Sequence, residues 1–157
     1  MDYRITGLSP APFAPLIVLD DHDLARHRAR RQVCDGKPGF PCRVTLEDAE
    51  PGETVLLVNY EHLPVESPYR ASHAIYVREA ARVPYDRVNQ IPPALQPRLL
   101  SLRAFDAAGL MVDADIVEGR EAEPLVRRFL ARSDVAYLHA HFARRGCFAA
   151  RIDRVEA

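Results

Sequence analysis

YLHAHFARRGCFAARID, residues 137–153, decides how the end of this chain folds. Apolar side chains alternate with other residues on both sides of a turn that ends in Gly146, which is typical of a β-hairpin. A short loop from Arg144 to Gly146 would pair Phe142 with Phe148 and put the apolar side chains of both strands on one face. The opposite face would then carry the polar and reactive side chains: His139, His141, Cys147 and Arg151.

Three kinds of chemistry fit this predicted face. A thiol near histidines and arginines suits a nucleophile or a redox group, with Cys147 and His139 as catalytic residues. The guanidinium fork of Arg151, with donors from His139 and His141, suits a carboxylate or phosphate. Two imidazoles and a thiolate from His139, His141 and Cys147 would suit zinc or iron, although Arg151 opposite His139 would put a positive charge beside the ion.

Residues elsewhere in the chain would complete such a pocket. A phenol, a guanidinium, a hydroxyl and an imidazole precede a predicted strand between residues 69 and 73, a composition suited to binding or proton transfer. We therefore expect a site for a small anionic or polar molecule, and the sequence does not decide between an enzyme and a binding protein. The ligand-binding residues beyond the hairpin would be Arg43, Tyr69, Arg70 and His73.

A different class of function follows from the tip of the same hairpin. If Arg144 and Arg145 are exposed, they would form a basic tip that docks a partner protein, and the chain would be a non-catalytic interaction module.

The segments before the hairpin predict the rest of the fold. A second hairpin turns at Gly109, with Leu102 opposite Ala114 and Arg103 opposite Asp113. Other strands are predicted at residues 3–6, 54–60 and 74–78, and helices at residues 20–31 and 121–132. The prediction is an α+β fold: a mostly antiparallel, curved sheet or partial barrel with two flanking helices.

Composition limits the class of protein. The 157 residues, of which 48% are hydrophobic, predict a single domain over residues 1–157. A net charge of −1 disfavours nucleic acid as a partner. No apolar run is long enough to cross a membrane and the N-terminus lacks a secretory pattern, so we expect a soluble, cytoplasmic protein with reduced cysteines.

Several short motifs together resemble a bacterial family catalogued as domain of unknown function 1203. They span roughly residues 37–154, and the resemblance implies a small, single-domain bacterial protein without implying a reaction. Relatives often have His-x-Arg-Asn where this chain has His139-Ala-His141-Phe142, which favours His141 as a donor to an anion over a metal ligand. The motifs are Phe40-Pro-Cys42-Arg43, Pro51-Gly-Glu53 with Val55-Leu-Leu57, Ser67-Pro-Tyr69-Arg70, Tyr137-x-His139 and Gly146-Cys147-Phe148.

Overall fold

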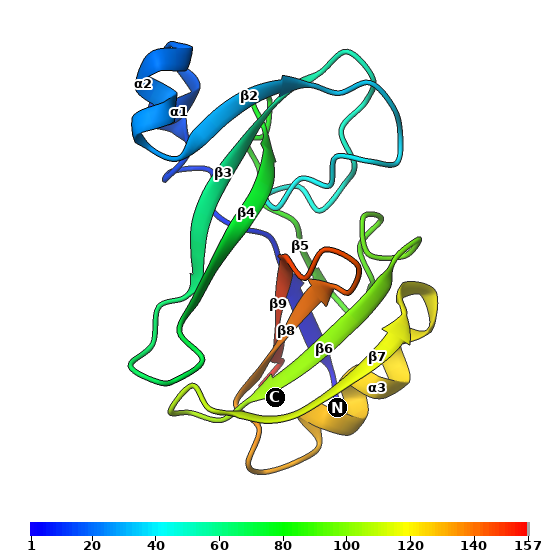
Figure 1. Cartoon of the computed structure of the whole chain (residues 1–157). Helices are drawn as coiled ribbons and strands as arrows, with labels where there is room; N and C mark the ends of the chain where they lie inside the picture. The colour runs from blue at the N-terminus through cyan, green and yellow to red at the C-terminus, as the bar shows by residue number, and fades with distance from the viewer. Residues whose placement is uncertain (157) are drawn as a thin grey trace.

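A computed structural model describes residues 1–156 of the chain. Figure 1 shows short helices at the N-terminal end, a small sheet above, and a larger sheet below with one helix packed beside it. The elements in chain order are β1 Tyr3–Thr6, α1 Ala14–Ile17, α2 Asp21–Arg26, β2 Ala29–Val33, β3 Thr54–Leu63, β4 Ala71–Arg78, β5 Asp86–Val88, β6 Leu99–Phe105, β7 Met111–Glu118, η1 Gly119–Glu121, α3 Ala122–Leu130, β8 Tyr137–Phe142 and β9 Phe148–Arg154.

The strands form two open antiparallel sheets. The larger has six strands in the order β5-β1-β9-β8-β6-β7, and the smaller has three in the order β2-β3-β4. All pairs of named strands are antiparallel. This confirms the predicted α+β class and its mostly antiparallel sheet.

The larger sheet is covered on both faces. On one face, α3 buries Leu125, Val126 and Phe129 in the main core, against the apolar side chains of β1, β6, β8 and β9. On the other face, the end of β3 brings Tyr60 and His62 against Phe148 of β9, with ring centroids 6.4 and 5.4 Å apart. The C-terminal hairpin therefore lies between α3 and the small sheet.

The register of the C-terminal hairpin differs from the predicted one. Ala140 lies opposite Ala150 as expected, but His141 lies opposite Phe148, so a β-bulge adds Ala149 as one extra residue to β9. The amide of Phe142 donates to the carbonyl of Cys147, which makes the loop one residue longer than predicted. Because side chains alternate along a strand, the bulge puts Phe148 on the histidine face and Cys147 on the core face.

The hairpin of β6 and β7 contains the same kind of irregularity. Phe105 lies opposite Met111 and Ala104 opposite Asp113, so Val112 is the extra residue. The predicted pairings of Leu102 with Ala114 and of Arg103 with Asp113 are wrong for this reason, because Leu102 lies opposite Asp115 and Arg103 opposite Ala114. Ile116 of the edge strand β7 is 61% exposed.

Two predicted helices have different outcomes. The one before the final hairpin is confirmed as α3. The one predicted at residues 20–31 is shorter: Asp20 caps α2 by accepting from the amide of Asp23 at 2.8 Å, and the chain enters β2 at Ala29. None of the helices within residues 1–156 is long and apolar enough to cross a membrane.

Candidate functional site: a cavity lined by arginines

A cavity of about 520 Å³ lies where the loop after β2 meets the turn between β8 and β9. Its walls combine positive charge with aromatic rings and one thiol, and Glu118 is the acidic residue among them. The lining residues are Pro38, Gly39, Pro41, Arg43, Tyr76, Pro97, Arg98, Leu99, Glu118, Phe142, Arg144, Arg145 and Cys147.

Arg43 is the most unusual residue of this wall because it is a cation that is only 2% exposed. Its Nε donates to the carbonyl of Phe148 at 2.7 Å and its Nη1 to the carbonyl of Pro41 at 2.5 Å. Its Nη2 lies 3.0 Å from the Sγ of Cys147. Burial lowers the pKa of Arg43 to about 10. Within residues 1–156, no carboxylate forms an ion pair with this guanidinium.

The three contacts of Arg43 leave two of its N–H donors unused. A guanidinium carries about five N–H bonds, one on Nε and two on each Nη. The three contacts use one N–H of Nε, one of Nη1 and one of Nη2. One N–H is left on each Nη, so both terminal nitrogens can still donate to an oxygen of a carboxylate or phosphate.

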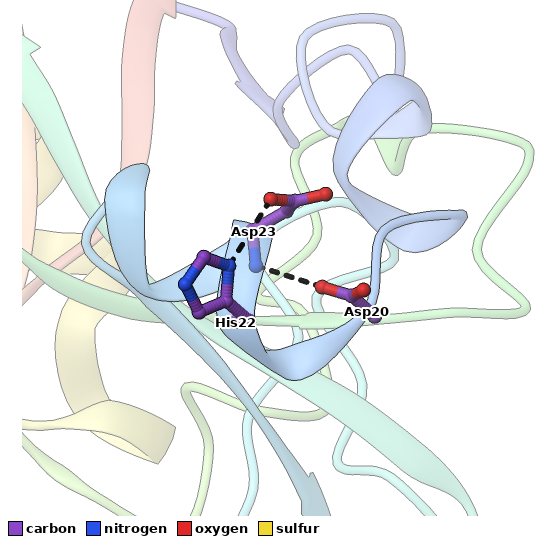
Figure 2. A group of neighbouring side chains, drawn as sticks. All are labelled: Asp20, His22 and Asp23. Atoms are coloured by element: carbon purple, nitrogen blue, oxygen red, sulfur yellow. Dashed lines mark hydrogen bonds and ion pairs between the residues drawn. The ribbon is translucent and has the colours of Figure 1, made fainter.

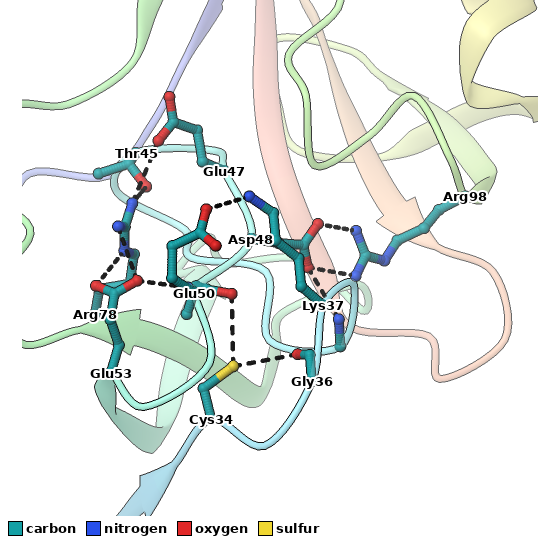
Figure 3. Close-up of polar contacts among 12 residues, drawn as sticks. Cys34, Gly36, Lys37, Thr45, Glu47, Asp48, Glu50, Glu53, Arg78 and Arg98 are labelled. Carbon is teal, nitrogen blue, oxygen red and sulfur yellow. Dashed lines mark hydrogen bonds and ion pairs between the residues drawn. The ribbon is translucent and has the colours of Figure 1, made fainter.

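A second arginine of the wall, Arg98, is paired with Asp48, which is not one of the lining residues. Arg98 donates to both oxygens of Asp48 at 2.7 and 2.8 Å (Figure 3), and Asp48 is only 7% exposed. The guanidinium carbons of Arg43 and Arg98 lie 4.9 and 5.1 Å from the centroid of the Phe142 ring. Phe142 therefore makes a cation–π contact with both guanidinium groups.

Further ion pairs brace the loop that carries Arg43. Figure 3 shows Arg78 of β4 donating to both oxygens of Glu53 at 2.9 Å and Lys37 bonded to Glu50. Since the loop has no regular strand, these contacts fix the segment that delivers Pro41 and Arg43 to the cavity.

Two more arginines reach the cavity from the hairpin turn. Arg144 and Arg145 are exposed, and Gly146 after them has φ +79°, the left-handed conformation that favours glycine. Sequence reasoning placed these arginines at the tip and did not assign them to the pocket, and it missed Arg98. The signal that could have found Arg98 is weak, because it sits in a proline-rich loop about fifty residues from Asp48.

The histidines of the hairpin lie on the other face of β8. His139 and His141 are 3% and 1% exposed, and their ring centroids lie 6.1 and 5.0 Å from that of His62 on β3. We call these three residues the histidine cluster. The ring of Phe148 stacks on His62 and meets His139 edge-on at 4.9 Å. His62 was not predicted as part of this group, because no pattern in the sequence connects it with the C-terminal hairpin.

All three imidazoles are neutral at pH 7. Burial, followed by neighbouring histidines and arginines, lowers the pKa of His139 to about 3. Burial, together with the positive charge of Arg103, lowers the pKa of His141 to about 3 and that of His62 to about 4. The buried Nδ1 atoms of His62 and His139 have no hydrogen-bond partner within the described chain.

The other predicted site residues do not join the cavity. Tyr69 is 41% exposed, and Arg70 pairs at the surface with Glu61 and Glu66. Arg151 lies opposite His139 as predicted, but it bonds Asp153 and covers the Tyr137 ring at 4.1 Å. His73 bonds the carbonyl of Ala74 at 2.8 Å on β4, on the side of the histidine cluster. The cavity thus keeps Arg43 and Cys147 of the predicted set.

The three residues of the alternative metal site are not brought together. Cys147 faces the core and the cavity, whereas His139 and His141 face the small sheet. Over residues 1–156, one group of three side chains has its donor atoms within 4.8 Å of one another, namely Asp20, His22 and Asp23 (Figure 2). It is largely exposed, and its geometry follows from the cap of α2.

These features define an antiparallel α+β protein with an arginine-lined cavity at the turn of its C-terminal hairpin. Comparison with family models matches residues 39–154 to the family described as protein of unknown function (DUF1203), and the chain belongs to that family. No curated protein and no solved structure matches the chain.

Proposed function

We propose that this chain binds a small molecule through a carboxylate or phosphate group in the arginine-lined cavity. The observation that supports this most is the buried guanidinium of Arg43, which has no carboxylate partner in the described chain and two unused N–H bonds. Burying an uncompensated charge costs several kcal/mol, of order 3–5 when a partner is missing. A bound anion would offset that cost, and a protein that gained nothing from the charge would be more stable with an apolar residue there.

Binding is better supported than catalysis. Cys147 borders the cavity, and Arg43 is positioned to stabilise negative charge on its Sγ. The histidine that most often serves as the base for a thiol nucleophile is not among the residues that line the cavity. A role for His139 as the catalytic partner of Cys147 would require a rearrangement of the hairpin.

Calorimetric titration with sulfate, inorganic phosphate and citrate tests the proposal. A double variant, Arg144→Gln with Arg145→Gln, should weaken binding of the best probe by at least about tenfold, because charged hydrogen bonds are worth about 1.5–3 kcal/mol each. The matched control removes the same charge from exposed Arg26 and Arg87, which lie outside the cavity. Absence of binding for every probe, or equal weakening in the control, would overturn the proposal.

A third variant separates this proposal from the docking of a protein on the hairpin tip. Arg43→Lys keeps the charge but removes the fork, and Arg43 is too buried to touch a docked protein. Weaker anion binding in this variant, with far-UV circular dichroism unchanged, would support the cavity. Unchanged binding in a folded Arg43→Lys variant would contradict it.

A further inference from the structure

The strand β7 forms an exposed edge of the larger sheet (Figure 1). It is eight residues long, and no strand among residues 1–156 pairs with its outer side. The four residues at its centre, Asp113 to Ile116, are exposed. The strand at the other edge, β5, has only three residues. Because long exposed edges invite pairing with another chain and short ones do not, length does not protect β7.

The register shows which backbone groups of β7 point away from the sheet. The amide of Gly119, directly after β7, donates to the carbonyl of Arg98, directly before β6. In an antiparallel pair the bonds to one neighbour come from every second residue. The pairing is regular back to Asp113, so the odd-numbered residues of β7 bond to β6. The amides of Ala114 and Ile116 therefore point toward the free edge.

Both of these outward amides are bonded within the chain. The amide of Ala114 donates to Oδ1 of Asp113, and the amide of Ile116 donates to Oδ1 of Asp115, each at 2.8 Å. Each aspartate thus covers the edge amide of the residue after it. An approaching strand would have to displace both carboxylates before it could pair with these amides.

The two carboxylates are themselves held in place from the side of α3. The Oδ2 of Asp113 accepts from Arg132 at 2.5 Å, and the Oδ2 of Asp115 accepts from Arg128 at 3.2 Å. One oxygen of each aspartate therefore bonds an arginine while the other bonds an edge amide. The arginines restrict the rotation of the carboxylates, so the amides stay covered.

We propose that Asp113 and Asp115 prevent the edge of β7 from pairing with a second copy of this chain. Such a copy would need the amides that the carboxylates occupy. If Ala114 paired with Ile116 of the copy in an antiparallel arrangement, the Asp115 residues of the two chains would also lie directly opposite each other. Like charges in that position are destabilising. The inference does not depend on the proposed function of the cavity.

Sedimentation velocity from micromolar to millimolar protein tests this inference on the wild type and on a double variant, Asp113→Ala with Asp115→Ala. Moderate salt screens the two arginines that the double variant leaves unpaired. The wild type should remain monomeric. The double variant should self-associate with a dissociation constant at least about tenfold lower. A folded double variant that stays as monomeric as the wild type would overturn the proposal.

Two control variants separate the edge from other effects of the substitutions. Asp21→Ala with Asp35→Ala removes the same charge from exposed positions outside β7. Arg128→Gln with Arg132→Gln removes the ion pairs to α3 but keeps both aspartates as acceptors for the edge amides. Both controls should remain monomeric. Self-association of either control as strong as that of the double variant would overturn the proposal.

Amide hydrogen exchange, measured by nuclear magnetic resonance, shows where any self-association occurs. In the double variant, the amides of Ala114 and Ile116 should exchange more slowly as the protein concentration rises. Self-association that leaves both amides unprotected, or a wild type that protects them only when concentrated, would contradict the proposal. If the double variant does not fold, Asp115→Ala alone frees one amide and removes the facing carboxylates, so it should still self-associate more than the wild type. A folded Asp115→Ala variant that does not would overturn the proposal.

Discussion

The Nη2 of Arg43 lies 3.0 Å from the Sγ of Cys147, although about a hundred residues separate them in sequence. This contact joins the loop after β2 to the first residue before β9 and closes one wall of the cavity. It also distinguishes Cys147 from the other cysteines, because Cys34 bonds backbone carbonyls and Cys42 accepts from the amide of Arg78.

The first prediction concerns this thiol. Iodoacetamide added to the folded protein should modify Cys147 before Cys34 or Cys42, because Cys147 alone of the three lines the cavity and is 6% exposed, against 2% and 1%. Peptide mass spectrometry at short times measures the order. Saturating sulfate should slow the labelling of Cys147, and urea-unfolded protein should label at all three. Equal labelling of Cys34 in the folded protein would contradict the assignment.

The second prediction concerns the buried ion pair of Asp48 and Arg98. Asp48→Asn should lower the free energy of unfolding by about 3 kcal/mol, because it leaves a largely buried guanidinium without its anion. Asp134→Asn is the matched control, since its pair with Arg132 is exposed and its loss should leave the free energy of unfolding nearly unchanged. Urea unfolding measures both. If both variants lowered the free energy of unfolding equally, the buried pair would contribute no more to stability than the exposed one.

The third prediction compares two turn glycines with nearly the same backbone. Gly109 and Gly146 have φ angles of +78° and +79°, so alanine at either should cost about 1–2 kcal/mol. A Cβ at Gly109 would also lie 2.7 Å from a methyl carbon of Val65, whereas nothing lies within 4 Å of one at Gly146. Gly109→Ala should therefore have the lower melting temperature. A lower melting temperature for Gly146→Ala would mean that the Val65 side chain can move away from the new methyl group at little cost.

The fourth prediction concerns the stability of the whole chain in acid. His139 and His141 stay neutral in the folded protein down to a pH of about 3, while the unfolded chain binds protons below about 6.5. The free energy of unfolding should therefore fall as the pH decreases through this interval, by about 2 kcal/mol for each histidine at pH 5. The fall should stop near the folded pKa, where both states bind protons.

Urea titrations at pH 7 and pH 5 measure that effect, and variants assign it. His139→Gln should reduce the difference between the two pH values. His22→Gln removes a largely exposed histidine and should leave the difference as in the wild type. A His139→Gln variant with the full difference would show that other groups are responsible.

The sequence predicted the elements of the fold better than their side-chain directions. Alternation placed the strands of the two hairpins, and the apolar stripe of α3 placed its helix, because both patterns are local, whereas β2 and β5 were not predicted. The errors came from the bulges at Val112 and Ala149, where one extra residue reverses every later side chain. Neither bulge has a glycine that would have marked it.

The site was predicted only in part, because its geometry also depends on strand register and on contacts between distant segments. Arg43 and Cys147 were chosen by residue type, and the structure brings them together. Their separation from His139 depends on the register at Ala149, and the arrival of Arg98 depends on a contact with Asp48 across a long loop. Long-range contacts of this kind leave no periodicity in one sequence.

The extra residue at Ala149 also bears on how insertions and deletions would act in this family. Deleting it would make Ala140–Ala150 and His141–Phe148 consecutive pairs without a bulge, so that Phe148 would stay on the histidine face and Cys147 on the core face. A single codon lost from β9 at this position would thus remove the bulge and keep the arginine–thiol pair of Arg43 and Cys147. Family members with the same motif and a strand one residue shorter at this position would therefore carry the same side chains on each face of the hairpin.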